Sequence, residues 1–333
     1  MSKRRKVLVA WYRPEMRVPG AFERLEAAGF EVVLNDTGKM YDEAQMLEVL
    51  PGSFATLAGS EPYNERVLAA APGLKVIARM GVGYDQVDVA AATRHGVAVA
   101  MAFGTNHEAV ADHALALIAA LGCQLLPCHQ KVLSGGWGGN MPVSLWQSTV
   151  GILGLGRIGR ALARRCRGFE MRLLAHDPYA DRAWAEANGV ELVSLERLFA
   201  DADFVSVHAP HTPETDRIVN RETLALMKPG AYLVNTARGG LVDEAALIEA
   251  LQAGRIAGAG LDVFEVEPLP ADSPLRRLDN VLLTPHCAGA NVRSMADMLA
   301  RCIESVIAVG EGRSPGAPYV LNPEVFASRV AAR

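Results

Sequence analysis

The sequence lacks the features that would place the protein in several specialised classes. Its 333 residues carry a formal net charge of −4, so it has no basic excess with which to bind nucleic acid. Five cysteines form no C-x-x-C pair, which argues against a disulfide framework and favours a reducing compartment. The longest apolar helix candidate, residues 114–126, falls short of the ~20 residues that span a bilayer. We expect a soluble, cytoplasmic protein without nucleic-acid or membrane partners.

The N-terminus also lacks a secretory signal. A basic run over residues 3–6 is followed by an apolar stretch that Arg13 interrupts, whereas a signal needs roughly 7–15 apolar residues before its cleavage site. The run is therefore interpreted as a solvated tail. Length and a hydrophobic content of 50% instead permit two domains with separate cores.

Short apolar runs alternate with helical periodicity along most of the chain, which is typical of α/β folds with parallel sheets. In the first hundred residues this pattern predicts strands at 6–10, 31–34, 54–58, 75–78 and 97–100, and helices at 19–28, 65–71 and 88–95. A long helix is predicted over 106–134, with a late kink at Pro127, and the glycine-rich segment 135–139 ends it.

A second series of strands and helices is predicted from residue 149 to about 284, followed by a helix over 292–309 and an irregular tail over 313–333. The expected fold is therefore two doubly wound parallel-sheet domains, a Rossmann cofactor domain and a flavodoxin-like substrate domain, with a cleft between them. We expect the cofactor domain at 102–290 and the substrate domain at 1–101 and 291–333.

The most specific local motif is a G-x-G-x-x-G turn formed by Gly154, Gly156 and Gly159. It follows a predicted strand, opens a predicted helix, and precedes Asp177 by about the expected interval. The helix N-terminus would bind the pyrophosphate of a dinucleotide, and Asp177 would accept hydrogen bonds from the ribose hydroxyls. Because no arginine immediately follows Asp177, the motif favours NAD over NADP.

Three later strands each end next to a charged side chain, where open α/β sheets bind ligands. These side chains are Arg238, Glu267 and His286. An arginine suits the carboxylate and carbonyl of a 2-oxo acid, and a histidine held by a glutamate can move a proton to and from the carbonyl oxygen. We therefore expect a dehydrogenase that moves a hydride between NAD(H) and a small 2-hydroxy or 2-oxo acid.

With these motifs, the chain resembles the D-isomer-specific 2-hydroxyacid dehydrogenase family. The resemblance covers segments 78–85, 154–159, 235–244, 261–268 and 284–286, and it is strongest to members like 3-phosphoglycerate dehydrogenase that have no regulatory domain. It implies that Arg238 orients substrate, that Glu267 and His286 transfer the proton, and that a homodimer forms through the helix after residue 106. It further implies cofactor contacts at Arg157, Ile158, Pro210, Thr236, Ala237, Asp262 and Gly289, and substrate contacts at Arg79, Val82 and Gly83.

Two questions stay open from the sequence. The substrate is undetermined, since the segments 59–62 and 137–139 lack the extra arginines that a phosphorylated acid would need. An NAD(H)-sensing binding protein of the same fold is the alternative to an enzyme. Neither His208 nor His211 has ligand spacing, so no metal site is expected. The remaining histidines considered have no partner visible in the sequence, and we interpret them as structural or solvated: His95, His107, His113, His129 and His176.

Overall fold

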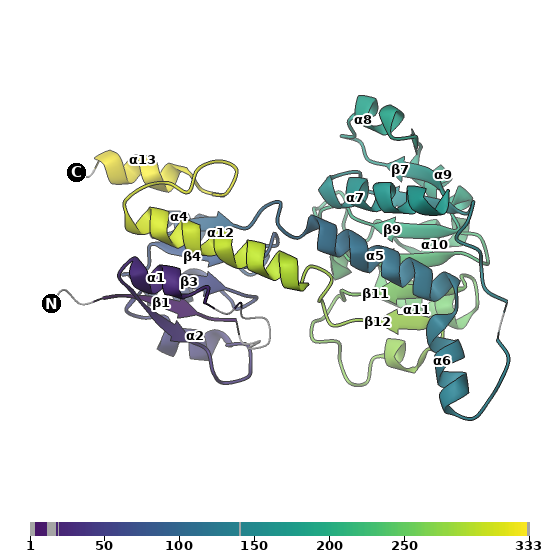
Figure 1. Cartoon of the computed structure of the whole chain (residues 1–333), viewed down its shortest axis with the longest axis horizontal. Helices are drawn as coiled ribbons and strands as arrows, with labels where there is room; N and C mark the ends of the chain where they lie inside the picture. The colour runs from purple at the N-terminus through teal and green to yellow at the C-terminus, as the bar shows by residue number, and fades with distance from the viewer. Residues whose placement is uncertain (1–3, 12–17, 19, 140, 332–333) are drawn as a thin grey trace. The chain divides into compact units, whose positions relative to one another are not determined.

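The structure is a computed structural model that describes residues 4–11, 18, 20–139 and 141–331. The chain divides into two compact units, one formed by Met1–Asn106 with Ala290–Arg333 and the other by His107–Gly289 (Figure 1). Each unit is built on one sheet in which every strand pairing is parallel. The predicted class of two parallel-sheet α/β domains is therefore confirmed.

The sheet of the first unit has the order β2-β1-β3-β4-β5, which is the flavodoxin-like arrangement. Its strands are short and largely apolar because both faces are covered. The strands are β1 (Arg5–Val9), β2 (Phe30–Leu34), β3 (Ser53–Ala58), β4 (Val76–Arg79) and β5 (Ala98–Met101).

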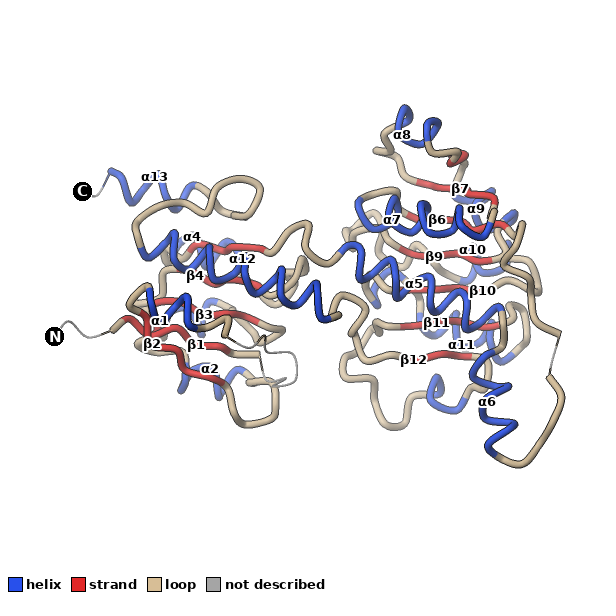
Figure 2. Tube along the Cα trace, in the orientation of Figure 1, coloured by secondary structure: helices blue, strands red, loops and turns tan. Residues whose placement is uncertain are grey.

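A helix from the far end of the chain completes this unit. The helix α12 (Val292–Gly310) contacts β3, β4 and β5 (Figure 2). On one of its faces, Met295, Leu299 and Ile303 are buried in the core of the unit. This spacing of four residues keeps the three side chains on one face of an amphipathic helix. The other helices are α1 (Glu23–Ala27), α2 (Glu43–Val49), α3 (Glu65–Ala69), α4 (Val89–Arg94) and α13 (Glu324–Ala331).

The sheet of the second unit has seven strands in the order β12-β11-β10-β9-β6-β7-β8. Chain order reverses between β6 and its neighbour β9, which makes this the point where doubly wound sheets bind ligands beyond the carboxyl ends of their strands. The strands are β6 (Thr149–Leu153), β7 (Arg172–His176), β8 (Val190–Leu192), β9 (Phe204–Val207), β10 (Tyr232–Asn235), β11 (Gly258–Leu261) and β12 (Val281–Leu283).

Helices cover both faces of this sheet. On one face α5 packs against α7 and contacts β10 and β11. The helices are α5 (His107–Gly122), α6 (Leu125–Leu133), α7 (Arg157–Cys166), α8 (Arg182–Ala187), α9 (Leu195–Asp201), α10 (Arg221–Leu226) and α11 (Glu244–Gln252), with short 3-10 turns η2 (Arg167–Phe169), η3 (Gly239–Leu241) and η4 (Pro274–Arg277).

The prediction of a single long helix over 106–134 is wrong. The chain breaks between α5 and α6, where Gln124 has a left-handed φ of 56°, and the two helices are bent by 60°. Pro127 does not kink a helix: it lies in the first turn of α6, where a missing amide is tolerated. Among the described residues no single helix is long and apolar enough to cross a membrane, and α5 with α6 meets that test only as a bent pair.

The structure corrects three smaller predictions. The tail after residue 313 is not wholly irregular, since α13 forms there. The helix α2 was not predicted. The helix expected over 19–28 is shorter, with α1 starting at Glu23, while Pro19 lies outside the described residues.

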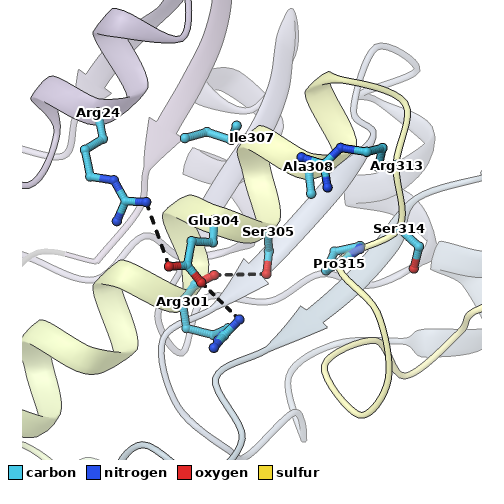
Figure 3. A pocket seen from close by; sticks show the side chains of 9 residues that line it. All are labelled: Arg24, Arg301, Glu304, Ser305, Ile307, Ala308, Arg313, Ser314 and Pro315. Carbon is cyan, nitrogen blue, oxygen red and sulfur yellow. Dashed lines mark hydrogen bonds and ion pairs between the residues drawn. The ribbon is translucent and has the colours of Figure 1, made fainter.

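A cavity of about 350 Å³ lies between α1, α12 and the segment that follows α12 (Figure 3). Glu304 points between two of the arginines that line it, with carboxylate oxygens 3.8 Å from Arg24 and 3.0 Å from Arg301. None of the predicted site residues lines this cavity. Its arginines form exposed ion pairs, which contribute little stability.

Candidate active site

The glycine turn after β6 is packed so closely that two of its glycines admit no side chain. Gly154 has a φ of 96°, and a Cβ there would lie 2.6 Å from the amide nitrogen of Ala209. A Cβ at Gly159 would lie 2.2 Å from the carbonyl oxygen of Gly154. These contacts seat α7 directly against the loops after β6 and β9, as a dinucleotide turn requires.

Gly156, by contrast, faces open space. No atom lies within 4 Å of a Cβ built on it, and it caps α7 without a side-chain hydrogen bond. The first-turn amides of α7 are therefore left for a bound anion. Arg157, exposed, and Ile158, half-buried, form the start of that turn. This cradle fits the pyrophosphate of a dinucleotide.

Asp177 follows β7 and is held against the glycine turn. Its Oδ2 accepts a hydrogen bond from the amide of Leu155 at 2.8 Å, and its Oδ1 accepts one from the amide of Tyr179, also at 2.8 Å. Each oxygen keeps a further lone pair for a ligand hydroxyl. The carboxylate is thus oriented beside the phosphate cradle, where a dinucleotide carries its ribose.

Arg238 follows β10 in a turn that Asn235 holds. The Asn235 side chain donates to the carbonyl of Arg238 at 2.9 Å and accepts from the amide of Ala237 at 3.0 Å. Gly239 next to it must be glycine, because a Cβ would lie 1.9 Å from the carbonyl oxygen of Phe264. The loop that carries Arg238 therefore packs directly on the loop that leads to Glu267.

Glu267 and His286 form a hydrogen-bonded pair. The Oε2 of Glu267 lies 2.6 Å from the Nδ1 of His286, and its Oε1 accepts from the amide of Phe264 at 3.1 Å. The His286 side chain is 49% exposed, so its Nε2 is the nitrogen that can face a substrate. A carboxylate on one imidazole nitrogen orients the ring for proton transfer at the other.

Asp262 follows β11 and is fully buried. Its Oδ1 accepts from the Thr284 hydroxyl at 2.6 Å and from the amide of Cys287 at 3.0 Å, and its Oδ2 accepts from the amide of Ala288 at 2.9 Å. The carboxylate therefore binds the loop that carries His286. The contact between Asp262 and the cofactor that the family resemblance implies stays a prediction.

Other predicted cofactor residues lie on the same edge of this sheet. Thr236, after β10, is buried and its hydroxyl has no partner among the described residues, which leaves it available to a ligand. Pro210 follows β9 and its carbonyl accepts from Thr215. Ala237 is half-buried beside Arg238, and Gly289 ends the His286 loop.

His208, for which no ligand role is expected from the sequence, is a half-buried residue after β9. Desolvation lowers its pKa to about 3, so the ring is neutral at physiological pH. One nitrogen, Nε2, lies 2.8 Å from the Ser206 hydroxyl, while Nδ1 has no partner among the described residues. The ring is therefore polar and uncharged, and it is the backbone of His208 that lies against Gly154.

The predicted substrate residues belong to the first unit, at the carboxyl end of β4. Arg79 donates from Nη1 to the carbonyl of Met80 at 2.7 Å and approaches that of Ala58 at 3.5 Å. No described residue accepts a hydrogen bond from the amides of Val82 or Gly83. Two adjacent amides without partners suit a carboxylate.

One cluster of potential metal-ligating side chains was not predicted from the sequence. A nitrogen of His113, a carboxylate oxygen of Asp262 and the sulfur of Cys287 lie within 4.8 Å of one another. His113 comes from α5, and its Nε2 lies 3.0 Å from the hydroxyl of Thr284. No local motif signals this contact, because its partners are 171 positions apart in the chain.

Comparison with known proteins agrees with this geometry. The model of the D-isomer specific 2-hydroxyacid dehydrogenase NAD binding domain matches residues 115–288. The glyoxylate reductase of Korarchaeum cryptofilum is 42% identical over 276 residues, which cover 81% of this chain and 82% of that protein. The chain belongs to the D-isomer specific 2-hydroxyacid dehydrogenase family. As a member it is an NAD-dependent oxidoreductase of 2-hydroxy and 2-oxo acids.

Other relatives differ in length or substrate. The D-3-phosphoglycerate dehydrogenase of Archaeoglobus fulgidus is 38% identical over 92% of this chain, which spans only 58% of that relative. A crystal structure of the D-lactate dehydrogenase from Aquifex aeolicus, complexed with NAD and lactic acid, is 28% identical with a TM-score of 0.83, covering 95% of this chain and 98% of that one. The family resemblance, the fold class and NAD as cofactor are confirmed.

Proposed function

We propose that this dehydrogenase uses Arg238, Glu267 and His286 to interconvert a small D-2-hydroxy acid and its 2-oxo acid. The observation that carries the proposal is the 2.6 Å hydrogen bond between Glu267 and His286, which follow β11 and β12 of the same sheet whose strand β6 leads into the dinucleotide turn. NAD, when bound, supplies the hydride acceptor or donor. The protein must supply orientation and the proton.

Each member of the trio has a separate task. The planar guanidinium of Arg238 pairs with the substrate carboxylate and polarises the carbonyl oxygen. His286 gives a proton from Nε2 to that oxygen during reduction and takes it back during oxidation. Glu267 keeps the ring oriented and stabilises its charged form.

We assign cofactor binding to the glycine turn and its neighbours. Gly154 and Gly159 allow the close packing, the amides after Gly156 bind the pyrophosphate, and Asp177 binds the ribose hydroxyls. A 2′-phosphate at Asp177 would meet a carboxylate at close range, so NAD is preferred over NADP. The contacts proposed for the remaining part of the cofactor are Arg157, Ile158, Pro210, Thr236, Ala237, Asp262 and Gly289.

In the first unit, the amides of Val82 and Gly83 would bind the substrate carboxylate, and Arg79 supports their loop. The segment after β3, next to the end of β4, carries the carboxylate of Glu61 and no cation. Glu61 is 1% exposed and accepts a hydrogen bond from the amide of Gly59 at 2.7 Å. Burial raises the pKa of Glu61. Because a phosphate needs several cations, we propose an unphosphorylated 2-oxo acid, such as the glyoxylate named for the Korarchaeum relative.

Replacing the substrate-binding arginine tests this assignment. Arg238→Ala should lower kcat/KM for the preferred 2-oxo acid by at least about 100-fold, because charge at the carbonyl oxygen loses its partner. NADH binding, followed by fluorescence titration, should change little. Arg221→Ala, at an exposed arginine paired with Glu249, is the matched control. Near-normal turnover by Arg238→Ala would remove Arg238 from the site.

We also propose a cytoplasmic homodimer. The five cysteines are free thiols, as in a reducing compartment. The predicted contact was the helix after residue 106, but the apolar residues Leu117, Ile118 and Leu121 of α5 are buried within its own unit. The proposed contact surface is therefore α6 and the segment after it, which expose large apolar side chains at Leu125, Leu126, Val132, Leu133, Trp137, Met141 and Trp146.

A further inference from the structure

We propose that His113 and Thr284 are positioning residues for the catalytic His286, acting through the buried carboxylate of Asp262. The proposal rests on the assignment of His286 as the proton-transfer group. The proposed relay is a chain of hydrogen bonds that runs from α5 to the loop of His286. His113 is hydrogen-bonded to Thr284, Thr284 to Asp262, and Asp262 to the backbone around His286.

The end of the relay is a loop wrapped around one carboxylate. Asp262 accepts two backbone amides, those of Cys287 and Ala288, which directly follow His286. Its own carbonyl oxygen accepts the amide of His286 at 2.8 Å. Asp262 therefore bonds to three successive residues of the loop, and a shift of its side chain would move the catalytic ring.

His286 needs such support because its backbone is in an unfavourable region. Its φ is 50°, a left-handed conformation that is unfavourable for non-glycine residues and persists only where surrounding contacts enforce it. Asp262 enforces this conformation from both sides of His286, because it accepts hydrogen bonds from the Thr284 hydroxyl before it and from the backbone amides after it. The position of the ring relative to Glu267 thus depends on this carboxylate.

The number of hydrogen bonds that each group can donate or accept determines which group is the donor at each step of the relay. The ionised carboxylate of Asp262 can only accept, so the single hydroxyl proton of Thr284 goes to Asp262 at 2.6 Å. The Thr284 oxygen must then accept its second hydrogen bond, and the atom within reach is Nε2 of His113 at 3.0 Å. The relay therefore requires a proton on Nε2 of His113.

The same atoms do not form a suitable metal site. The oxygens of Asp262 that a cation would need already accept three hydrogen bonds. His113 and Thr284 satisfy each other without an ion. A cation would have to break the bonds that hold the His286 loop, so the hydrogen-bonded relay is the arrangement that the geometry favours.

Paired substitutions at Thr284 test the relay. Thr284→Val keeps the shape and removes the hydroxyl, so it should lower kcat by about 100-fold, the cost of a misplaced catalytic group, while the Kd for NADH stays within about twofold. Thr284→Ser keeps the hydroxyl and should retain kcat within about threefold. Equal losses in both variants, or normal kcat in Thr284→Val, would overturn the proposal.

A second pair tests the first member of the relay. His113→Gln keeps a donor near the Nε2 position and should retain more activity than His113→Leu, by about tenfold. Chelation with EDTA should leave wild-type kcat unchanged. A loss of kcat on chelation that zinc restores would overturn the relay in favour of a metal site.

One readout does not depend on turnover. In the wild-type protein with ¹⁵N-labelled histidine, NMR should show His113 with its proton on Nε2. The Thr284→Val variant should lose that signature and shift the His286 resonances. If the protein turns over none of the acids, the proposed function is wrong, but the NMR measurement still tests whether the relay exists. An Nδ1-protonated, neutral His113 in the wild type would refute it.

Discussion

Asp177 is the side chain on which the proposed preference for NAD over NADP depends. Backbone amides of Leu155 and Tyr179 fix both of its oxygens at 2.8 Å, so it cannot turn away from a bound ribose without losing two hydrogen bonds. If the ribose binds at Asp177 as proposed, the carboxylate is already oriented for its hydroxyls and would repel a 2′-phosphate.

Replacing this residue should narrow the discrimination between cofactors. Asp177→Ala removes both the hydrogen bonds to the ribose and the repulsion of the 2′-phosphate, so KM for NADH should rise by roughly tenfold while the NADH/NADPH ratio of kcat/KM falls. Steady-state kinetics with both cofactors measure this. Asp181→Ala, at an exposed carboxylate that caps α8, is the control. An unchanged ratio in Asp177→Ala would exclude Asp177 from the ribose site.

The proximity of Glu267 and His286 could be predicted from the sequence, whereas the residues that hold the His286 loop could not. Glu267 and His286 each follow a strand of one parallel sheet, and the carboxyl ends of such strands meet at one edge. His113 reaches the same place from a helix. Its contact with Thr284 depends on the packing of α5 on the sheet, which no spacing in the sequence specifies, so it was interpreted as structural or solvated.

Strands were predicted more accurately than helices. The strands predicted at 31–34, 54–58 and 97–100 match β2, β3 and β5 to within one residue at each end, because buried parallel strands are short, continuous apolar segments. The break after α5 was missed because helical periodicity continues across Gln124. The helix α2 did carry a signal that could have been used, the capping box of Asp42 and Gln45.

The apolar surface of α6 should govern assembly. Leu133, 73% exposed, lies at the end of this helix, and Leu133→Glu should convert a dimer into monomers because it places a charge in the proposed interface. Light scattering after size exclusion gives the mass directly. Leu226→Glu, at an exposed leucine of α10, should leave the dimer intact. A wild-type monomer at micromolar concentration would contradict the proposed assembly.

The two units divide the predicted chemistry between them. The second unit, His107–Gly289, contains the dinucleotide turn, the trio and the relay, and the family match at residues 115–288 lies within it. The first unit contributes the loop of Val82 and Gly83. We infer that the chain reduces an unphosphorylated 2-oxo acid with NADH.

The most direct measurement is the loss of NADH absorbance with glyoxylate, hydroxypyruvate, pyruvate, 2-oxoglutarate and phosphohydroxypyruvate. We predict rapid turnover of one of the unphosphorylated acids, with a D-configured product where the product is chiral, and poor turnover of phosphohydroxypyruvate. Preference for phosphohydroxypyruvate would contradict the substrate class inferred from Glu61. NADH binding without turnover of any of these acids would contradict the enzymatic account and favour the NAD(H)-sensing alternative.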